Sequence, residues 1–107
     1  MQVDWHGVFP AATTQFAPDL SIDIGETQRA QDALVRDGVH GLIIMGTVGE
    51  HNSLEPDEKR DVLRAAVEVV NKRVPVLVGV SEFDTNRAFA FARDAEKIGA
   101  DGLMLLP

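Results

Sequence analysis

The short apolar run Leu42–Met45 constrains the fold more than any other feature of the sequence. Gly41 leads into it, and it stops abruptly at the turn sequence Gly46–Glu50. Because no polar residue interrupts the run, we expect a strand that is buried on both faces, as in a parallel sheet. The turn supplies glycines, a hydroxyl and closely spaced backbone N–H groups at the carboxyl end of that strand. This is the place where α/β folds hold small anions.

The rest of the chain alternates apolar runs with segments of helical periodicity. We expect further strands over residues 7–12, 74–78 and 102–106, with Gly79 ending the second of these three. Helices should separate the strands, over residues 23–36, 56–73 and 84 or 85 to 98. The resulting order, β-α-β-α-β-α-β, requires parallel strands and right-handed crossovers. Half of a barrel and a small open doubly wound sheet both fit this pattern.

The predicted helices carry boundary signals of their own. Ser21 or Asp23 can cap the first helix, and Gly38 stands where a left-handed residue would end it. Pro56 suits the first position of the second helix, and Lys72-Arg73 suit its last turn. The expected inner faces are Ile24, Ala30, Ala33 and Leu34; Val62, Leu63, Ala66, Val69 and Val70; and Ala88, Phe91, Ala92, Ala95 and Ile98.

Composition excludes several classes of protein. The chain has 107 residues, 45% of them apolar, and a net charge of −7, so we expect a soluble domain that binds neither nucleic acid nor membrane. It has no cysteine, which excludes disulfides and thiolate chemistry and favours the cytoplasm. The first residues, Met1–His6, do not have the pattern of a signal peptide. No apolar run approaches the roughly 18 residues of a membrane span.

The motif Gly46–Glu50, with Ser53-Leu54 and the acidic helix start Glu55–Arg60 behind it, resembles the dihydrodipicolinate synthase/N-acetylneuraminate lyase family. The segment Thr13–Phe16 shares the resemblance, with Gln15 where the family commonly has proline. Members are (β/α)8 TIM barrels, class I aldolases and related lyases that act through a Schiff base with a pyruvate-type substrate. Because a complete barrel takes roughly 250 residues, we expect residues 1–107 to be a single segment, the N-terminal half of a longer barrel.

The resemblance implies roles for four residues of the motif, Gly46, Thr47, Val48 and Gly49. In the family, the two residues between the glycines bind the carboxylate of a 2-keto acid through backbone N–H groups and hydroxyls. Thr47 keeps its hydroxyl and would also act catalytically in a proton relay, whereas Val48 lacks one. The glycines should permit close approach of the backbone and unusual dihedral angles. Glu50 would fix the loop. A tight turn without a ligand is the alternative.

Other polar residues carry weaker signals. Thr13 and Thr14 end the first predicted strand and either line the cavity or cap the strand. Ser81, Glu82 and Asp84 are expected in a solvated loop with a helix cap, and the three lysines (Lys59, Lys72 and Lys97) on solvated helix faces. The histidines (His6, His40 and His51) form no recognised metal motif.

We therefore expect a Schiff-base lyase or aldolase acting on pyruvate or another 2-keto acid without a cofactor. The resemblance places the imine-forming lysine and a catalytic tyrosine beyond Pro107 and implies a homotetramer. The 107-residue chain alone would then be inactive, and its two open strand edges would make it self-associate. Two alternatives remain: a non-catalytic, self-associating half-barrel that binds a small anion, and a metal-dependent aldolase.

Overall fold

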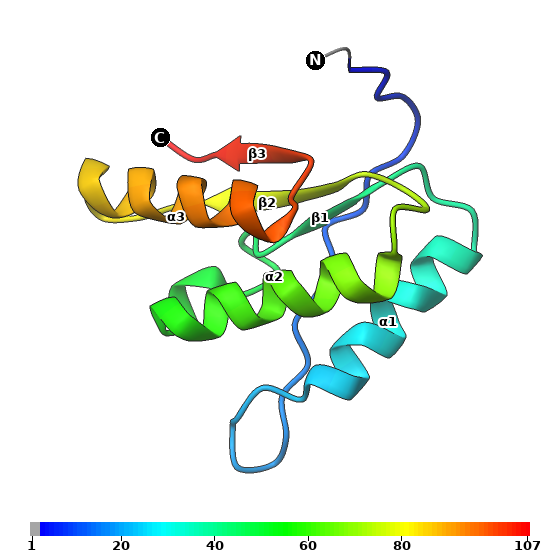
Figure 1. The fold of residues 1–107 in the computed structure, drawn as a ribbon. Helices are drawn as coiled ribbons and strands as arrows, with labels where there is room; N and C mark the ends of the chain where they lie inside the picture. Colours follow the sequence, from blue (N-terminus) through cyan, green and yellow to red (C-terminus); the bar gives the residue numbers. More distant parts are fainter. Residues whose placement is uncertain (1–2) are drawn as a thin grey trace.

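Three parallel strands form one sheet in the order β1-β2-β3 in the computed structural model, which describes residues 3–107 (Figure 1). The strands are β1 (Leu42–Ile44), β2 (Val76–Val80) and β3 (Gly102–Leu105). Leu42 pairs with Val76, and Leu77 pairs with Gly102. The predicted α/β class and parallel pairing are confirmed. Met1 and Gln2 of the predicted segment lie outside the described residues.

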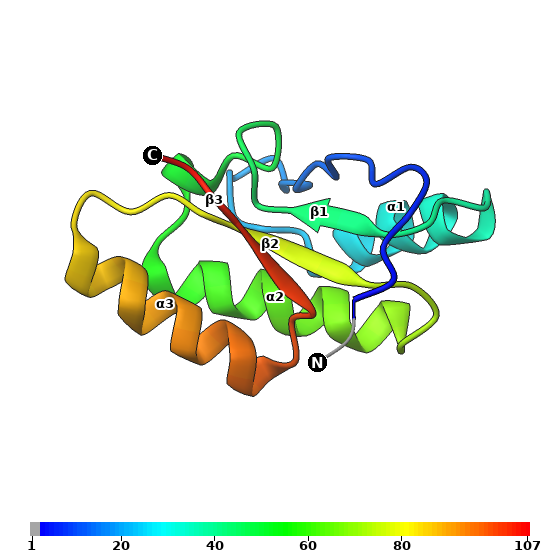
Figure 2. The ribbon, with the colours of Figure 1, turned by 90° about the horizontal axis from the view of Figure 1, so that it is seen from above.

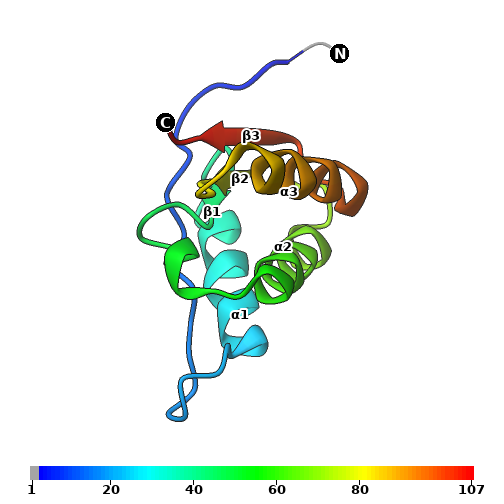
Figure 3. The ribbon, with the colours of Figure 1, turned by 90° about the vertical axis from the view of Figure 1, so that its left-hand side faces the viewer.

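Three α-helices lie together on one side of the strands (Figure 3). They are α1 (Ile24–Arg36), α2 (Pro56–Val70) and α3 (Thr85–Ile98), and a short 3-10 helix, η1 (His51–Ser53), precedes α2. Of the alternative caps, Asp23 caps α1 and Asp84 caps α3, because each carboxylate accepts a backbone N–H of the first turn. Gly38, just past α1, has φ +97°, as expected.

The second helix ends earlier than predicted. Asn71 adopts the left-handed conformation that closes α2, so Lys72 and Arg73 lie beyond the helix and not in its last turn. Arg73 nevertheless folds back, and its guanidinium donates hydrogen bonds to the carbonyl oxygens of Val69 and Val70. The Val69 carbonyl is one that the end of the helix leaves without a backbone partner, and the Val70 carbonyl also accepts the Arg73 N–H at 3.1 Å.

The predicted strand over residues 7–12 is reduced to a single bridge between Ala11 and Ile43. The segment does run beside β1, since the Ala12 N–H donates to the Ile43 carbonyl at 2.9 Å and the Ile43 N–H donates to the Pro10 carbonyl at 3.0 Å. Pro10 has no N–H to continue the ladder, and Gly7 has φ +79°, which is not strand geometry. These two residues explain why the pairing does not extend.

The same N-terminal segment presses two aromatic rings onto strand backbones. A Cβ atom on Gly41 would lie 2.3 Å from the Phe9 ring, and one on Gly102 would lie 2.5 Å from the Trp5 ring. The Trp5 and Phe9 ring centroids are 6.3 Å apart. The segment therefore contacts both the residue that precedes β1 and the first residue of β3.

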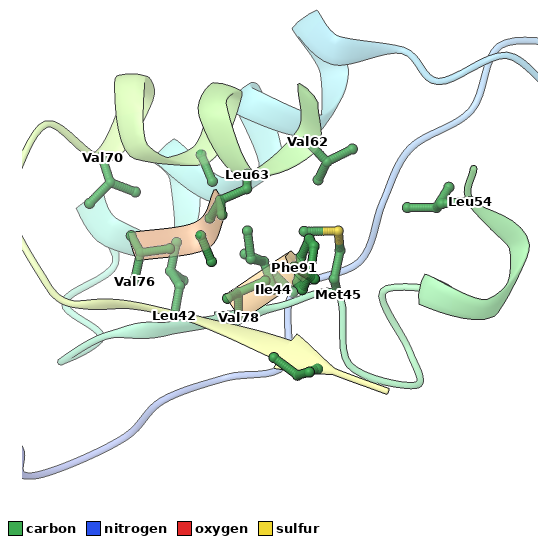
Figure 4. Close-up of a cluster of buried hydrophobic side chains, with 14 residues drawn as sticks. Leu42, Ile44, Met45, Leu54, Val62, Leu63, Val70, Val76, Val78 and Phe91 are labelled. Atoms are coloured by element: carbon green, nitrogen blue, oxygen red, sulfur yellow. The ribbon is translucent and has the colours of Figure 1, made fainter. Parts of the chain in front are cut away.

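The core lies between the sheet and the helices. The side chains of Leu42, Ile44 and Val78 point from the strands towards α2, which contributes Val62, Leu63 and Val70 (Figure 4). The predicted inner faces of α2 and α3 are confirmed at Val62, Leu63, Ala66, Val70, Phe91 and Ala95, which are buried, while Val69, Ala88, Ala92 and Ile98 are half-buried. The central strand β2 is buried along its whole length, as a strand covered on both faces should be.

The outer edge of β3 differs from that of β1. Leu103 and Leu105 are 46% and 70% exposed, although they belong to the face that the helices cover elsewhere. A groove of about 440 Å³ beside them, between α3 and β3, is lined mainly by apolar side chains, including Phe83 and Phe89. Within residues 3–107, no helix is long and apolar enough to cross a membrane.

Candidate functional site

The turn after β1 exposes two adjacent backbone donors. The Gly46 carbonyl accepts the Gly49 N–H at 3.1 Å, and the Thr47 carbonyl accepts the Glu50 N–H at 3.0 Å, so the turn is closed twice. The N–H groups of Thr47 and Val48 have no hydrogen-bond partner among the described residues, and both residues are exposed. Two neighbouring free N–H groups beside a hydroxyl form an arrangement that can receive a carboxylate.

Two buried side chains hold this turn in place. The Thr14 hydroxyl donates to the Gly49 carbonyl at 2.8 Å, and Nδ1 of His51 lies 3.1 Å from the Gly46 carbonyl oxygen. Thr14 is 6% exposed and His51 is 3% exposed. Of the two roles considered for Thr14, the structure supports neither lining nor strand capping; the hydroxyl anchors the motif. Thr13 is exposed, and its hydroxyl accepts a hydrogen bond from the Gln15 side chain.

Close packing explains Gly49 and Gly79. A Cβ atom on Gly49 would lie 2.7 Å from the backbone nitrogen of Met45, and one on Gly79 would lie 2.2 Å from the Met45 carbonyl oxygen. The prediction that Gly79 ends its strand is wrong, because Gly79 lies inside β2 and lets the backbone at Met45 rest on it. Glycine inside a strand commonly marks such an approach.

The unusual dihedral angles belong to other residues than expected. Neither Gly46 nor Gly49 has a positive φ, whereas Met45 and Glu50, on either side of them, have φ +52° and +61°. Left-handed conformations of such residues cost on the order of 1–3 kcal/mol and gather at functional sites. The motif is therefore held between two strained residues.

Glu50 fixes the loop through its backbone. Its N–H donates to the Thr47 carbonyl, and its carbonyl accepts the Ser53 N–H at 2.9 Å. Its side chain is exposed and makes no hydrogen bond to the described residues. The loop-fixing role expected of Glu50 thus does not involve its carboxylate.

The loop after β2 is exposed at Phe83 and Asp84, as the sequence predicts, but not at Glu82. Glu82 forms an ion pair with Lys59 at 3.0 Å, and the two side chains are only 15% and 10% exposed. The prediction that Lys59 is solvated is therefore wrong, because this partner 23 residues away lets its charge be buried. Asp84 is the predicted helix cap, and Ser81 is half-buried.

A second ion pair, between Arg60 and Asp94, joins α2 to α3. The Arg60 guanidinium contacts Asp94 at 2.7 Å and lies 5.2 Å from the centre of the Phe91 ring. The hydrogen bond from Arg60 lowers the pKa of Asp94 below its ordinary value. The charges of Lys59, Glu82, Arg60 and Asp94 are thus paired within the protein.

The remaining lysines and histidines lie away from the motif or serve the fold. Lys72 and Lys97 are exposed, as predicted. Nδ1 of His40 accepts the Val8 N–H at 2.9 Å, and the His6 ring lies 5.1 Å from the His40 ring. No group of three or more His, Asp or Glu residues within 3–107 is arranged to hold a metal ion.

The turn after β1, the loop after β2 and the end of β3 all lie towards the left-hand side of Figure 2, at the carboxyl ends of the strands. Sites in barrels and open α/β sheets lie at this end. The model of the dihydrodipicolinate synthetase family matches residues 4–107. The chain belongs to this family. The fold is accordingly the N-terminal part of a (β/α)8 barrel.

Individual members of the dihydrodipicolinate synthetase family are similar to this chain in sequence and in structure. The chain is 36% identical over 104 residues to the 4-hydroxy-tetrahydrodipicolinate synthase of Desulforamulus reducens, covering 97% of this chain and 35% of that protein. It superposes on dihydrodipicolinate synthase from Bacillus anthracis with a TM-score of 0.91 and 31% identity, over 99% of this chain and 36% of that one.

A third relative was solved with a ligand. The structure of YagE from E. coli, a prophage protein of the same family, is a complex with pyruvate; it matches with a TM-score of 0.89 and 32% identity, over 92% of this chain and 33% of that one. The chain spans about a third of the length of each of these relatives. Family members named as synthases and lyases identify the chain as part of a lyase family.

Proposed function

We propose that the turn Gly46–Gly49 binds the carboxylate of pyruvate or another 2-keto acid. The observation that carries the proposal is the pair of N–H groups of the exposed residues Thr47 and Val48, which have no hydrogen-bond partner within residues 3–107, on a turn held by buried side chains. The Thr47 hydroxyl adds a third donor and would take part in proton transfer. The pyruvate complex of YagE supports this choice of ligand.

Val48, in place of a second hydroxyl residue, removes one side-chain donor from the site. Val48 keeps its backbone N–H, so the anion loses one side-chain donor and not the backbone donors. Such a donor is worth about 1.5–3 kcal/mol to a charged partner. The isopropyl group, half exposed at 51%, would instead contact an apolar part of the substrate. We therefore expect a keto acid that differs from that of relatives with two hydroxyls.

The imine would form on a lysine outside residues 1–107. A nucleophilic lysine must be a neutral amine close to the substrate. Lys59 is ion-paired with Glu82, and Lys72, just past α2, and Lys97, in α3, are both exposed, so none of the three suits the role. A tyrosine, which the chain lacks, would complete the proton relay.

We also propose that residues 1–107 form the N-terminal segment of a longer barrel domain. The exposed leucines of β3 and the threefold greater length of the relatives support this. The complete domain would be a cytoplasmic homo-oligomer, as family resemblance suggests, and the 107-residue chain alone would not catalyse the reaction.

Borohydride trapping tests the proposal. The 107-residue chain and the full-length product of its reading frame are incubated with pyruvate and borohydride, and intact mass is measured. We expect one reduced adduct on the full-length product and none on the 107-residue chain. An adduct on the chain itself would move the imine to Lys59, Lys72 or Lys97, and no adduct on either would overturn the Schiff-base mechanism.

A substitution tests the binding site separately. Thr47→Ala should weaken pyruvate binding about tenfold, since it removes one hydrogen bond to a carboxylate. Thr47→Ser, which keeps the hydroxyl, serves as the matched control and should bind nearly as well as the unmodified protein. Equal affinity of all three proteins for pyruvate, measured by calorimetry, would exclude Thr47 from the site.

A further inference from the structure

His51, two residues after Gly49, is a buried histidine that contacts the backbone of the motif. The ring is 3% exposed, its Nδ1 lies 3.1 Å from the Gly46 carbonyl oxygen, and its Nε2 is buried without a hydrogen-bond partner in the described part of the chain. His51 belongs to no recognised metal motif in the sequence, and no metal-binding cluster forms around it within residues 3–107.

The partner of Nδ1 decides the tautomer. A carbonyl oxygen only accepts hydrogen bonds, so Nδ1 must carry the proton and donate to Gly46. In the neutral ring, Nε2 then has only a lone pair, which is buried with nothing to accept from. An apolar side chain of similar size would fill this space without burying an unpaired acceptor. The Nδ1–H group is therefore what distinguishes histidine from a core residue here.

The oxygen that His51 holds belongs to the same peptide unit as the N–H of Thr47. The peptide unit is planar, and within residues 3–107 every peptide bond is trans, so the Gly46 C=O and the Thr47 N–H point in opposite directions. Fixing the oxygen fixes the plane and hence the direction of the N–H. The Gly49 N–H also donates to this oxygen at 3.1 Å, but it belongs to the turn itself and moves with it. His51 is the donor from outside the turn.

We propose that His51 is a positioning residue, which aims the Thr47 N–H at the substrate carboxylate through its hydrogen bond to the Gly46 carbonyl. This inference rests on the proposed keto-acid site. His51 does not touch the substrate; it sets the orientation of the peptide that does. The Thr14 hydroxyl fixes a second peptide unit in the same way, because it donates to the Gly49 carbonyl. That peptide unit includes the Glu50 N–H, which donates to the Thr47 carbonyl.

Two amides of different length test the role. In His51→Asn the side-chain amide nitrogen occupies a position close to that of Nδ1 and can donate to Gly46, whereas in His51→Gln it lies further out, near the position of Nε2. His51→Leu keeps the volume and removes the donor. In the full-length product, we expect His51→Gln and His51→Leu to weaken pyruvate binding about tenfold, comparable to the loss of a hydrogen bond to a charged group. His51→Asn should stay within about threefold of the unmodified protein.

Thermal unfolding of the same variants separates positioning from stability. A purely structural role would make affinity follow the melting temperature, with His51→Leu, the apolar replacement, binding best. Positioning requires the order Asn, then Gln and Leu, whatever their melting temperatures. Equal affinity of all three variants with the unmodified protein would overturn the proposal while leaving the keto-acid site intact.

The tautomer gives a test that needs no ligand. Imidazole nitrogen shifts in ¹⁵N-labelled protein distinguish Nδ1–H from Nε2–H, and we expect Nδ1–H. An Nε2–H ring would overturn the positioning role even if pyruvate binds. Failure of the unmodified protein to bind pyruvate would overturn the proposed function, and with it this role, while the nitrogen shifts would still report the hydrogen bond to Gly46.

Discussion

The two loops that follow β1 and β2 lie at the same end of the sheet but are built in opposite ways. The turn Gly46–Gly49 has neutral residues, free backbone donors and an exposed surface, and buried side chains from elsewhere hold it. The loop Ser81–Asp84 has charged side chains, but Glu82 is paired with Lys59 and Asp84 caps α3. The first loop leaves its donors available, while the second uses its charges within the protein.

This contrast shows why charge is a poor guide to the site. The protein has a net charge of −7, yet the proposed anion site is made from N–H groups, whose partial charges act locally. The two acidic residues after β2 are both paired with cations, Glu82 with Lys59 and Asp84 with Arg87. If the two loops are also independent in energy, a change that weakens one should leave the other unaffected.

The largest effect should come from Gly79→Ala, which attacks the contact between β2 and the turn after β1. The added Cβ would lie 2.2 Å from the Met45 carbonyl oxygen, and the nearest atoms all belong to the backbone of Met45 and Gly46, which cannot rotate away as a side chain would. We expect a loss of about 3 kcal/mol in the free energy of unfolding and loss of pyruvate binding. Gly25→Ala, whose Cβ would meet nothing closer than 3.7 Å, is the control and should be nearly neutral in denaturant unfolding.

Breaking the Lys59–Glu82 ion pair should destabilise the protein without affecting the first loop. Lys59→Met leaves a carboxylate that is 15% exposed without its partner, at a cost of about 2 kcal/mol. Lys59→Met combined with Glu82→Leu should recover most of this loss. Pyruvate affinity, measured by calorimetry, should be unchanged in both. A parallel loss of affinity would mean that the two loops are coupled.

Thr14→Val tests the anchoring of the first loop. Valine has nearly the same shape, but it removes the buried hydrogen bond to the Gly49 carbonyl and should cost about 1 kcal/mol of stability together with a several-fold loss of pyruvate affinity. Thr13→Val, on an exposed threonine one residue earlier, is the matched control. If both variants bind pyruvate equally well, the loop does not need the Thr14 hydroxyl.

The smallest effect should be the acid response of Asp94→Asn. Because Arg60 lowers the pKa of Asp94 in the folded state, the pair stabilises the fold above the unfolded-state pKa of about 3.9, and this stabilisation is lost as pH falls through the lower folded-state value. Removing the carboxylate should therefore make stability less dependent on pH below about 4. Thermal melts from pH 7 to pH 2.5 measure this, and identical acid profiles would show that the pair contributes nothing.

The α/β class, the parallel strands of the sheet and the three helices could be predicted from the sequence. Apolar runs and helical periodicity gave parallel strands and three helices, because burial on both faces leaves a direct mark in the pattern. Caps such as Asp23 and Asp84 are local and could be predicted from their spacing. Gly79 also gives a signal, a glycine beside an apolar run, but the same signal is typical of the end of a strand.

The contacts that make the site depend on residues distant in the sequence. Thr14 reaches Gly49 across 35 positions, and Lys59 reaches Glu82 across 23. No periodicity marks such partners, so Thr14 and Lys59 could not be assigned from the sequence. The left-handed conformation of Met45 could not be predicted from the sequence either, because it follows from the packing of its backbone on Gly79 and not from the preference of methionine.

The contact of Trp5 with Gly102 has a consequence for the order in which the protein folds. Bringing Trp5 to Gly102 closes a loop that spans almost the whole chain, and the entropy of closing it is lost before the contact can form. The Phe9 ring packs on Gly41, next to β1, whereas the Trp5 ring packs on the first residue of β3. The N-terminal segment can therefore reach its final place only once β1, β2 and β3 are assembled. We therefore expect residues 5–9 to be among the last of the described residues to reach their final positions.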